Sequence, residues 1–329
     1  MRYLIRRLIG GGVVLTIVSA VVFGVFYILP ADPARLACGK SCTPELMARI
    51  RHTLEIDQPL ATQYGRFVKG IFVGRTYLKG TTAQIKCPSP CLGYSYQTDA
   101  TVTSLIKDRL PATLSIAAGA SILWLFVGLL TGVISALRRG TWVDKLAQGF
   151  ALGGASLQIY FVGLVLQFIF VDKLNLLPSP GYVSPFDDFG GWFMQMILPW
   201  TTLAFLLSAI YARLTRAGML EVMSEDYIRT ARAKGLTKSR VNVKHVLRAA
   251  ITPIVTVFGL DLGQLLGGAV ITEYVFNIPG LGRLATDAVS NVDLPVIVGT
   301  VMFAAFFIVI ANIVVDLLYS VLDPKVRLQ

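Results

Sequence analysis

Six apolar runs, each long enough to cross a lipid bilayer, constrain this chain of 329 residues more than any other feature. A membrane-spanning α-helix needs about 20 consecutive, mainly apolar residues. The predicted spans are Leu8–Leu29, Leu110–Leu137, Leu146–Val171, Phe193–Leu214, Ile251–Val275 and Pro295–Leu322. Prolines and glycines interrupt several of them, which spanning helices tolerate because neighbouring helices satisfy the freed backbone groups. The sequence therefore predicts an all-α polytopic membrane protein with six transmembrane helices.

The composition agrees with a bilayer environment. Hydrophobic residues make up 54% of the chain and charged residues only 15%, whereas soluble domains carry about 25% charged residues. The formal net charge of +11 would also suit a nucleic-acid partner. The basic residues, however, lie mostly beside the ends of the apolar runs, and no basic patch interleaves with aromatic residues. We therefore expect no nucleic-acid binding.

The orientation follows from the lysines and arginines of the short loops, which concentrate on the cytoplasmic side. Positive charge precedes span 1, recurs between spans 2 and 3, and is densest between spans 4 and 5. The residues are Arg2, Arg6, Arg7, Arg138, Arg139, Lys145, Arg213, Arg216, Arg229, Arg232, Lys234, Lys238, Arg240, Lys244 and Arg248. Both termini are thus expected in the cytoplasm, and Ala31–Ala100 outside it. Span 1 is longer than the 7–15 apolar residues of a secretory signal, so we expect it to stay uncleaved.

We expect two domains, residues 1–102 and residues 103–329. The first comprises span 1 and an extracytoplasmic segment with all four cysteines, and the second contains a cytoplasmic loop at residues 213–250. The cysteines form two copies of one spacing, and their even number and position outside the membrane favour disulfides, with three possible pairings. We favour the local pairs Cys38–Cys42 and Cys87–Cys91, because Gly39, Pro88 and Pro90 suit tight turns. A single zinc site with four cysteine ligands is the alternative. The role of residues 35–97 stays open.

The cytoplasmic loop is polar, basic and helix-prone. Tyr227–Lys234 is predicted to form a short helix that Gly235 ends as a C-cap residue, and a second helix, Lys238–Ala249, leads into span 5. Such a helix is suited to transmit a movement of a cytoplasmic partner to the transmembrane helices. The alternative is an amphipathic helix that lies on the membrane surface.

The same loop carries a resemblance to a known family. Gly235, nine residues and then His245-Val246-Leu247-Arg248 resemble the EAA loop of bacterial ABC importer permeases, although Arg229, Thr230, His245 and Arg248 depart from its general pattern. Those departures are typical of the dipeptide/oligopeptide/nickel subfamily. The matching residues are Tyr227, Arg229–Leu236, His245, Leu247, Arg248 and Ala250. Four further segments also resemble that subfamily, namely Arg109–Leu114, Glu273–Leu284, Val315–Tyr319 and Leu322–Arg327. Leu29–Pro33 resembles the exit of span 1 in the first of its two paired permeases.

The resemblance implies the transmembrane fold of a type I ABC importer and half of a translocation pore in a bacterial cell membrane. A sister permease, two ATP-binding cassette subunits and an extracytoplasmic binding protein are the implied partners. ATP and magnesium would bind the cassette subunits, because this chain has no Gly-x-x-x-x-Gly-Lys-Ser/Thr phosphate loop. Peptides are the expected cargo, with nickel, glutathione or an oligosaccharide as alternatives within the subfamily. A self-contained channel or carrier and a membrane receptor are alternatives outside it.

The candidate site residues form three groups, and none is expected to be catalytic or to bind a metal or cofactor. Residues that would couple to the ATPase are Tyr227, Arg229, Thr230, Ala231, Ala233, Lys234, Gly235 and Leu236. Asp261 and Gln264 would line the path, because ionisable residues deep in a membrane are costly and usually functional; an internal hydrogen bond between helices is the alternative for Asp261. Residues that would contact the binding protein are Glu273, Phe276, Asn277, Pro279, Gly280 and Leu281.

Overall fold

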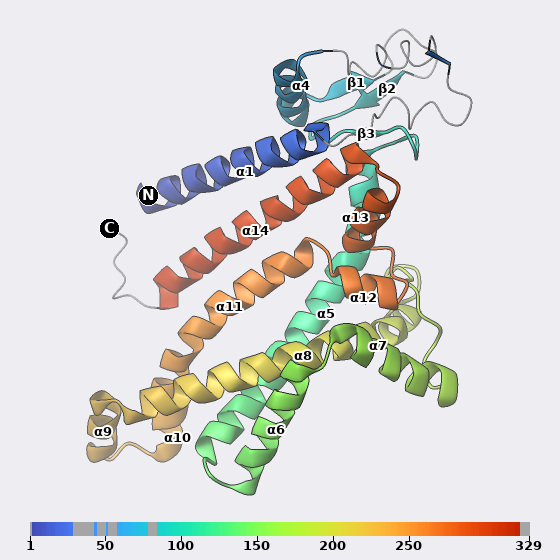
Figure 1. Cartoon of the computed structure of the whole chain (residues 1–329). Helices are drawn as coiled ribbons and strands as arrows, with labels where there is room; N and C mark the ends of the chain where they lie inside the picture. The colour runs from blue at the N-terminus through green and yellow to red at the C-terminus, as the bar shows by residue number, and fades with distance from the viewer. Residues whose placement is uncertain (1, 29–42, 45–50, 52–57, 78–83, 323–329) are drawn as a thin grey trace. The chain divides into compact units, whose positions relative to one another are not determined.

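The computed structural model describes residues 2–28, 43–44, 51, 58–77 and 84–322, and these are mainly helical (Figure 1). The long helices are α1 (Arg2–Ile28), α4 (Leu60–Val73), α5 (Val102–Leu137), α6 (Trp142–Ser156), α8 (Phe189–Ser224), α11 (Arg248–Leu266) and α14 (Leu294–Leu322). The shorter ones are α7 (Ile159–Gln167), the π-helix η1 (Phe168–Lys173), α9 (Asp226–Ala233), α10 (Lys238–Arg240), the π-helix η2 (Val241–Leu247), α12 (Val270–Val275) and α13 (Leu281–Ser290). Four short strands are β1 (Arg75–Tyr77), β2 (Ile85–Cys87), β3 (Tyr94–Ser95) and β4 (Ala100–Thr101).

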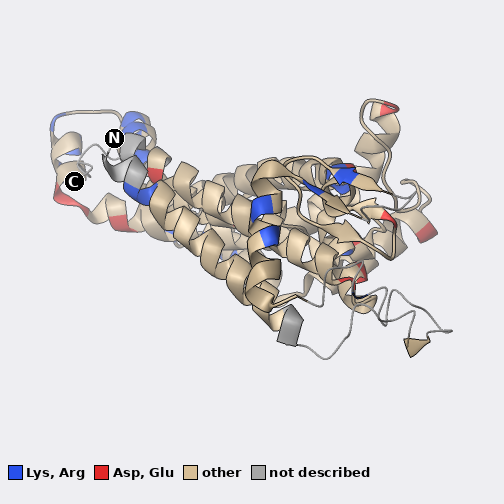
Figure 2. Ribbon diagram, turned by 90° about the horizontal axis from the view of Figure 1, so that it is seen from above, with Lys and Arg blue, Asp and Glu red and all other residues tan. Residues whose placement is uncertain are grey.

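The described helices confirm a polytopic helical protein with five or six spans. Five are long and apolar enough to cross a membrane, namely Arg6–Val25, Val102–Leu137, Phe189–Ser224, Lys238–Leu266 and Leu294–Leu317. A sixth span results if the bent pair α6 and α7–η1 counts as one crossing. In Figure 2 the long helical stretches are mostly tan, with few charged positions along them. That distribution is the one expected of helices whose middles face hydrocarbon.

The predicted span over Leu146–Val171 corresponds to a pair of helices with a sharp bend between them. The chain leaves the helix at Leu157 and Gln158, whose backbones are extended, and the two helical parts meet at 101°. Hydropathy measures only how apolar a stretch is, so it does not report such a change of direction. Span 5, predicted over Ile251–Val275, is present but ends earlier, because α11 ends at Leu266 and α12 is a separate helix of six residues.

The chain divides into two compact units. The first comprises residues 1–111 and 280–309, and the second comprises residues 112–279 and 310–329. The predicted division at residue 102 stays a prediction.

In the first unit, α4 packs on α1 through aromatic side chains. The ring of Phe23 lies 5.5 Å from that of Tyr64 and 5.7 Å from that of Phe67, between ring centroids. Beyond α4, β1 pairs antiparallel with β2, and β3 pairs antiparallel with β4. A buried cluster around Val102, Leu281 and Val296 joins α5, α13 and α14 within this unit.

Hydrogen bonds tie the hairpin of β3 and β4 to the loop between α13 and α14. The Ser95 hydroxyl donates to the buried Asp293 carboxylate, and the Gln97 side-chain amide donates to the Asn291 carbonyl at 2.7 Å. Burial, above all, raises the pKa of the Asp293 carboxyl. Residues 95–97 and residues 291–293, which are distant in sequence, therefore form one polar contact region in the first unit.

In the second unit, α8 is the central element and packs against α6, α7 and α11. Its contact with α5 is close because two glycines of α5 face it. A methyl group on Gly128 would lie 2.5 Å from Cβ of Tyr211, and one on Gly132 would lie 2.5 Å from Cβ of Thr215. The core beside this contact contains Trp124, Tyr211 and Ile254. Small residues allow helices in a membrane to approach this closely, and van der Waals contact then stabilises the pair.

Candidate functional site

The short helix predicted in the loop at residues 213–250 is present as α9. It follows α8 after a break at Glu225, whose backbone is extended. Three hydrogen bonds end it: the backbone N–H groups of Lys234, Gly235 and Leu236 donate to the carbonyls of Thr230, Arg232 and Ala231. Gly235 has φ = +78°, with open space around it. Glycine adopts this left-handed backbone without strain, which agrees with the helix-ending role predicted from the sequence.

One buried side chain holds α9 to the rest of the unit. Ile228 is fully buried in a cluster with Met219 of α8, Val241 and Val246 of η2, Ala136 of α5 and Ala250 of α11. Ala231 and Leu236 pack partly against the same cluster. The remaining candidates of the loop are exposed: Tyr227, Arg229, Thr230, Ala233, Lys234 and Gly235. α9 therefore has one anchored side and one side open to a partner.

The exposed side of α9 is basic and has an aromatic residue at its start. Arg229, Arg232 and Lys234 outnumber Asp226, which forms an exposed ion pair with Arg229 at 3.5 Å. Partial burial and the neighbouring Glu225 carboxylate raise the pKa of the Tyr227 hydroxyl. This surface suits a partner groove with acidic and apolar groups.

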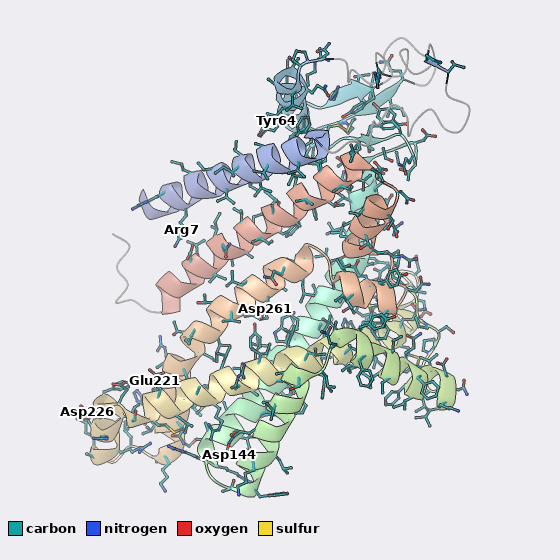
Figure 3. All side chains as sticks on the ribbon, in the orientation of Figure 1. Arg7, Tyr64, Asp144, Glu221, Asp226 and Asp261 are labelled. Carbon is teal, nitrogen blue, oxygen red and sulfur yellow. A yellow bond between two sulfur atoms is a disulfide. The ribbon has the colours of Figure 1, made fainter. Side chains whose placement is uncertain are left out.

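A second polar site lies near the same end of the unit, and the sequence analysis missed it. Asp144, at the start of α6 (Figure 3), is buried. It forms a bidentate ion pair with Arg216 of α8, with N–O distances of 2.8 and 3.0 Å. Asp144 lies beside the positively charged residues Arg138, Arg139 and Lys145. A lone acidic residue in a predicted positive loop was the available signal, but its partner 72 residues away in sequence was not.

Asp261 lies on α11 and faces α8 (Figure 3). The Tyr211 hydroxyl donates a hydrogen bond of 2.7 Å to its carboxylate. Trp124 of α5 lies next to Tyr211, with ring centroids 6.3 Å apart. The internal hydrogen bond foreseen as the alternative is thus present, while Asp261 itself stays only partly buried. Gln264, three residues on and so near Asp261 on the helix surface, is exposed.

The segment predicted to contact a binding protein is largely turned inward. Glu273 is fully buried, where its carboxylate accepts hydrogen bonds from the Thr113 hydroxyl at 2.9 Å and the Ala269 backbone N–H at 3.2 Å. Phe276 is also buried in the second unit, and Gly280 and Leu281 are buried in the first. Asn277 is exposed and Pro279 is partly exposed. Of the residues predicted to contact a binding protein, only Asn277 and Pro279 therefore reach the surface of the described chain.

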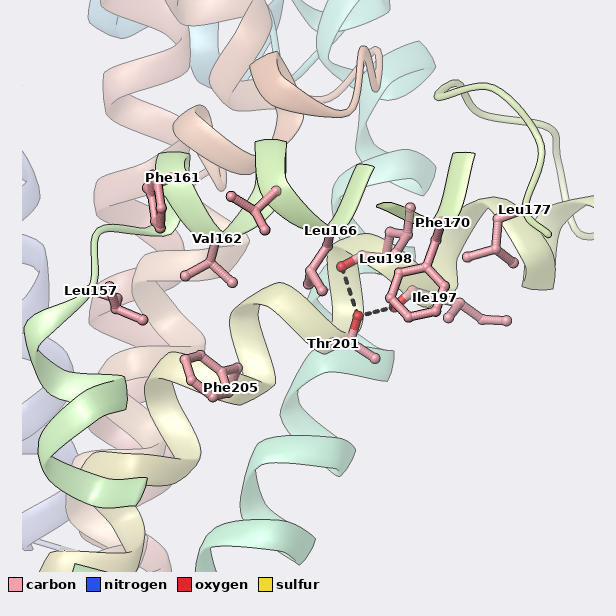
Figure 4. Close-up of a pocket in the computed structure, with 11 residues that line it drawn as sticks. Leu157, Phe161, Val162, Leu166, Phe170, Leu177, Ile197, Leu198, Thr201 and Phe205 are labelled. Atoms are coloured by element: carbon pink, nitrogen blue, oxygen red, sulfur yellow. Dashed lines mark hydrogen bonds between the residues drawn. The ribbon is translucent and has the colours of Figure 1, made fainter. Parts of the chain in front are cut away.

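A cavity of about 440 Å³ opens between α7–η1 and α8 (Figure 4). Its lining is apolar, from Phe161 and Leu166 on one wall to Ile197 and Phe205 on the other. The one hydroxyl in the lining, that of Thr201, donates to the Ile197 and Leu198 carbonyls of its own helix. A peptide backbone needs hydrogen-bonding partners when it leaves water. This cavity suits alkyl groups and lacks the polar groups that would hold a peptide.

In the segment that follows span 1, Cys87 and Cys91 form a disulfide bond, which confirms that predicted pair. Both cysteines are almost fully buried. Their bond removes them as zinc ligands, so a site of four cysteine ligands is absent. The predicted pair Cys38–Cys42 lies outside the described residues. No group of three or more potential metal-ligating side chains occurs in the part of the chain that the structure describes.

Comparison with known proteins places these features in one family. Residues 128–328 match the model of the binding-protein-dependent transport system inner membrane component, and residues 1–117 match the N-terminal model of such membrane components. The chain is 35% identical to a probable peptide ABC transporter permease protein, y4tP, of Sinorhizobium fredii, over 99% of both chains. It is 36% identical to the glutathione transport system permease protein GsiC of Escherichia coli, again over 99% of both.

A solved structure shows a related fold. It is a chain of the MetNI methionine ABC transporter in an inward-facing conformation. The similarity covers 67% of this chain and 97% of the MetNI chain, at 16% identity and a TM-score of 0.50. At that identity the similarity concerns the fold alone. The two family models and the full-length relatives together show that this chain belongs to the family of binding-protein-dependent transport system inner membrane components.

Proposed function

We propose that this chain is the permease subunit of an ATP-driven peptide importer, and that it forms half of a translocation pore with a sister permease. The observation that carries the proposal is the construction of α9. It is a short helix with an exposed basic side, anchored by the buried Ile228 at the end of a 36-residue membrane helix. A helix held in this way transfers a displacement to α8, α11 and η2. Full-length relatives named as peptide and glutathione permeases support the choice of cargo.

Two cytoplasmic ATP-binding cassette subunits would drive the pore and hold the ATP and magnesium. α9 of this chain would dock onto one of them. Tyr227, Arg229, Thr230, Ala233 and Lys234 form the proposed contact surface. Ala231, Gly235 and Leu236 would not carry the contact itself. They would stabilise the C-terminal end of α9, which positions the contact surface. This arrangement requires both termini in the cytoplasm of a bacterial cell, with the inner membrane spanned six times.

Asp261 and Gln264 are the proposed polar residues of the path. The carboxylate of Asp261 is held by Tyr211 and stays partly exposed, so it is placed to attract a peptide's amino group. The apolar cavity beside α7 contributes no such group. An extracytoplasmic binding protein would deliver the peptide, and Asn277 and Pro279 are the residues of the predicted contact that remain at the surface of the second unit.

The proposal is tested by reconstitution. The chain would be purified with its sister permease and cassette subunits, placed in proteoliposomes, and supplied with the binding protein, ATP and labelled di- and oligopeptides. ATP-dependent accumulation of peptide is the expected result. Glutathione, itself a tripeptide, is tested as a competitor and as a labelled cargo. Passive flux without ATPase subunits would contradict the proposal and support a channel or carrier.

A further inference from the structure

A single buried carboxylate connects three membrane helices near the α9 end of the second unit. Asp144 accepts hydrogen bonds from Ser135 at the end of α5, from the Gly140 backbone N–H in the turn, from Gln148 one turn further along α6, and from Arg216 of α8. The distances are 2.5 Å for Ser135, 2.9 Å for Gly140, 3.0 Å for Gln148, and 2.8 and 3.0 Å for the two Arg216 nitrogens.

This network is largely shielded from solvent. Asp144 is 2% exposed, and the Arg216 side chain is 24% exposed. A bidentate guanidinium–carboxylate pair fixes the orientation of both groups as well as their distance. The low dielectric of a buried site strengthens these hydrogen bonds and makes an unpaired charge there costly. α5, α6 and α8 are therefore held together at one point rather than merely packed.

The network lies directly beside the anchor of α9. Ser135 is followed by Ala136, which belongs to the cluster around Ile228. Arg216 precedes Met219 of that cluster by three residues, one helical turn along α8. A displacement of α9 thus reaches α8 within one turn of the point where Arg216 joins Asp144. Gly132, four residues before Ala136, keeps α5 in backbone contact with α8.

We infer that Asp144 and Arg216 are positioning residues for energy coupling, because they make α5 and α6 move with α8 when the partner ATPase displaces α9. Without the pair, α8 would tilt or bend while α5 and α6 stay behind, and ATP hydrolysis would continue with little peptide movement. This inference rests on the proposed function of the chain. A purely structural clamp is the competing explanation, and it predicts poorer assembly without a change in coupling.

The test compares three variants in the reconstituted complex. Asp144→Asn keeps the shape but removes the charge, Arg216→Lys keeps the charge but removes the bidentate geometry, and Ser135→Ala removes one neutral donor. For each, peptide transported per ATP hydrolysed is measured, together with the KM for peptide and the yield of assembled complex. We expect at least a roughly fivefold fall in peptide per ATP for Asp144→Asn, the lower end of usual coupling effects, with KM unchanged. Arg216→Lys should fall between this variant and wild type.

The matched control is Asp287→Asn, which breaks an arginine–aspartate contact of 4.0 Å within α13 that joins no two helices. It should leave peptide per ATP unchanged. Should Asp144→Asn fail to assemble, Ser135→Ala and Arg216→Lys still decide the question, because each leaves a charged pair or most donors in place. Assembled variants that transport as much peptide per ATP as wild type would overturn the inference. Absence of ATP-dependent uptake in the wild-type complex would instead count against the proposed function.

Discussion

The Tyr211 hydroxyl on α8 donates a hydrogen bond of 2.7 Å to the Asp261 carboxylate on α11, so two membrane helices meet through one polar contact. Tyr211 is fully buried beside Trp124, whereas Asp261 is only partly buried. The tyrosine therefore holds the carboxylate in place without covering it. This arrangement allows the structural role of Asp261 and its proposed role in transport to be separated by mutation.

Asp261→Asn should lower peptide uptake more than Tyr211→Phe does. The first change removes the charge, and the second removes only the donor, at a cost of about 1 kcal/mol for a hydrogen bond between membrane helices. Uptake rates and the melting temperature of the purified complex are measured for both. Equal losses of uptake in the two variants, in step with their melting temperatures, would reduce Asp261 to a packing role.

Gly235→Ala should uncouple ATP hydrolysis from uptake, and Gly235→Pro should do so more strongly. Gly235 has φ = +78°, a conformation that costs other L-residues roughly 1–2 kcal/mol, so the end of α9 would fray. Gly235→Asn is the matched control because asparagine tolerates the left-handed region. Uptake per ATP is compared across the series. Normal coupling in the proline variant would refute a role for the helix end.

Ile228→Ala should loosen α9 from the second unit and weaken retention of the ATPase subunits. Ile228 is fully buried among Met219, Val241 and Val246, and truncation to alanine at such sites costs about 2–5 kcal/mol, against about 0.5–1.5 kcal/mol for valine. Co-purification of the cassette subunits in mild detergent gives the readout. A graded loss from valine to alanine is expected, and full retention in both variants would show that α9 is held by other contacts.

The stability of the first unit should fall as pH rises above the ordinary pKa of Asp293. Burial raises the pKa of this carboxyl above its ordinary value of 3.8, although hydrogen bonds from Ser95 and the Val296 backbone lower it in part. The unfolded chain then releases its proton at a lower pH than the folded chain does. Folding is therefore disfavoured progressively from about pH 4 up to the raised pKa, and the effect is constant above it.

Asp293→Asn removes this dependence on pH. The melting temperature of the purified variant, minus that of wild type, should therefore increase as the pH rises from about 4 to about 7. Asp287→Asn, at a carboxylate that is half exposed, is the control for general charge effects. A difference between Asp293→Asn and wild type that stays constant over this range would contradict the raised pKa.

Much of this protein is determined by the sequence alone. The apolar runs identify spanning helices because burial in hydrocarbon depends on the composition of a contiguous stretch. Gly235 marks the end of α9 because a left-handed backbone is a local requirement. The cysteine spacing indicated the Cys87–Cys91 bond, and the loop motif indicated the family, for the same reason: each signal lies within a few neighbouring residues.

The tertiary structure alone decided which distant residues meet and which residues of a motif reach the surface. Asp144 and Arg216, and likewise Tyr211 and Asp261, are far apart in sequence and meet only because α6 and α11 pack on α8. Glu273 belongs to a recognisable motif but is buried against Thr113. The bend after Ser156 is equally invisible in hydropathy. Direction, pairing and exposure depend on packing between helices, which no local pattern of residues encodes.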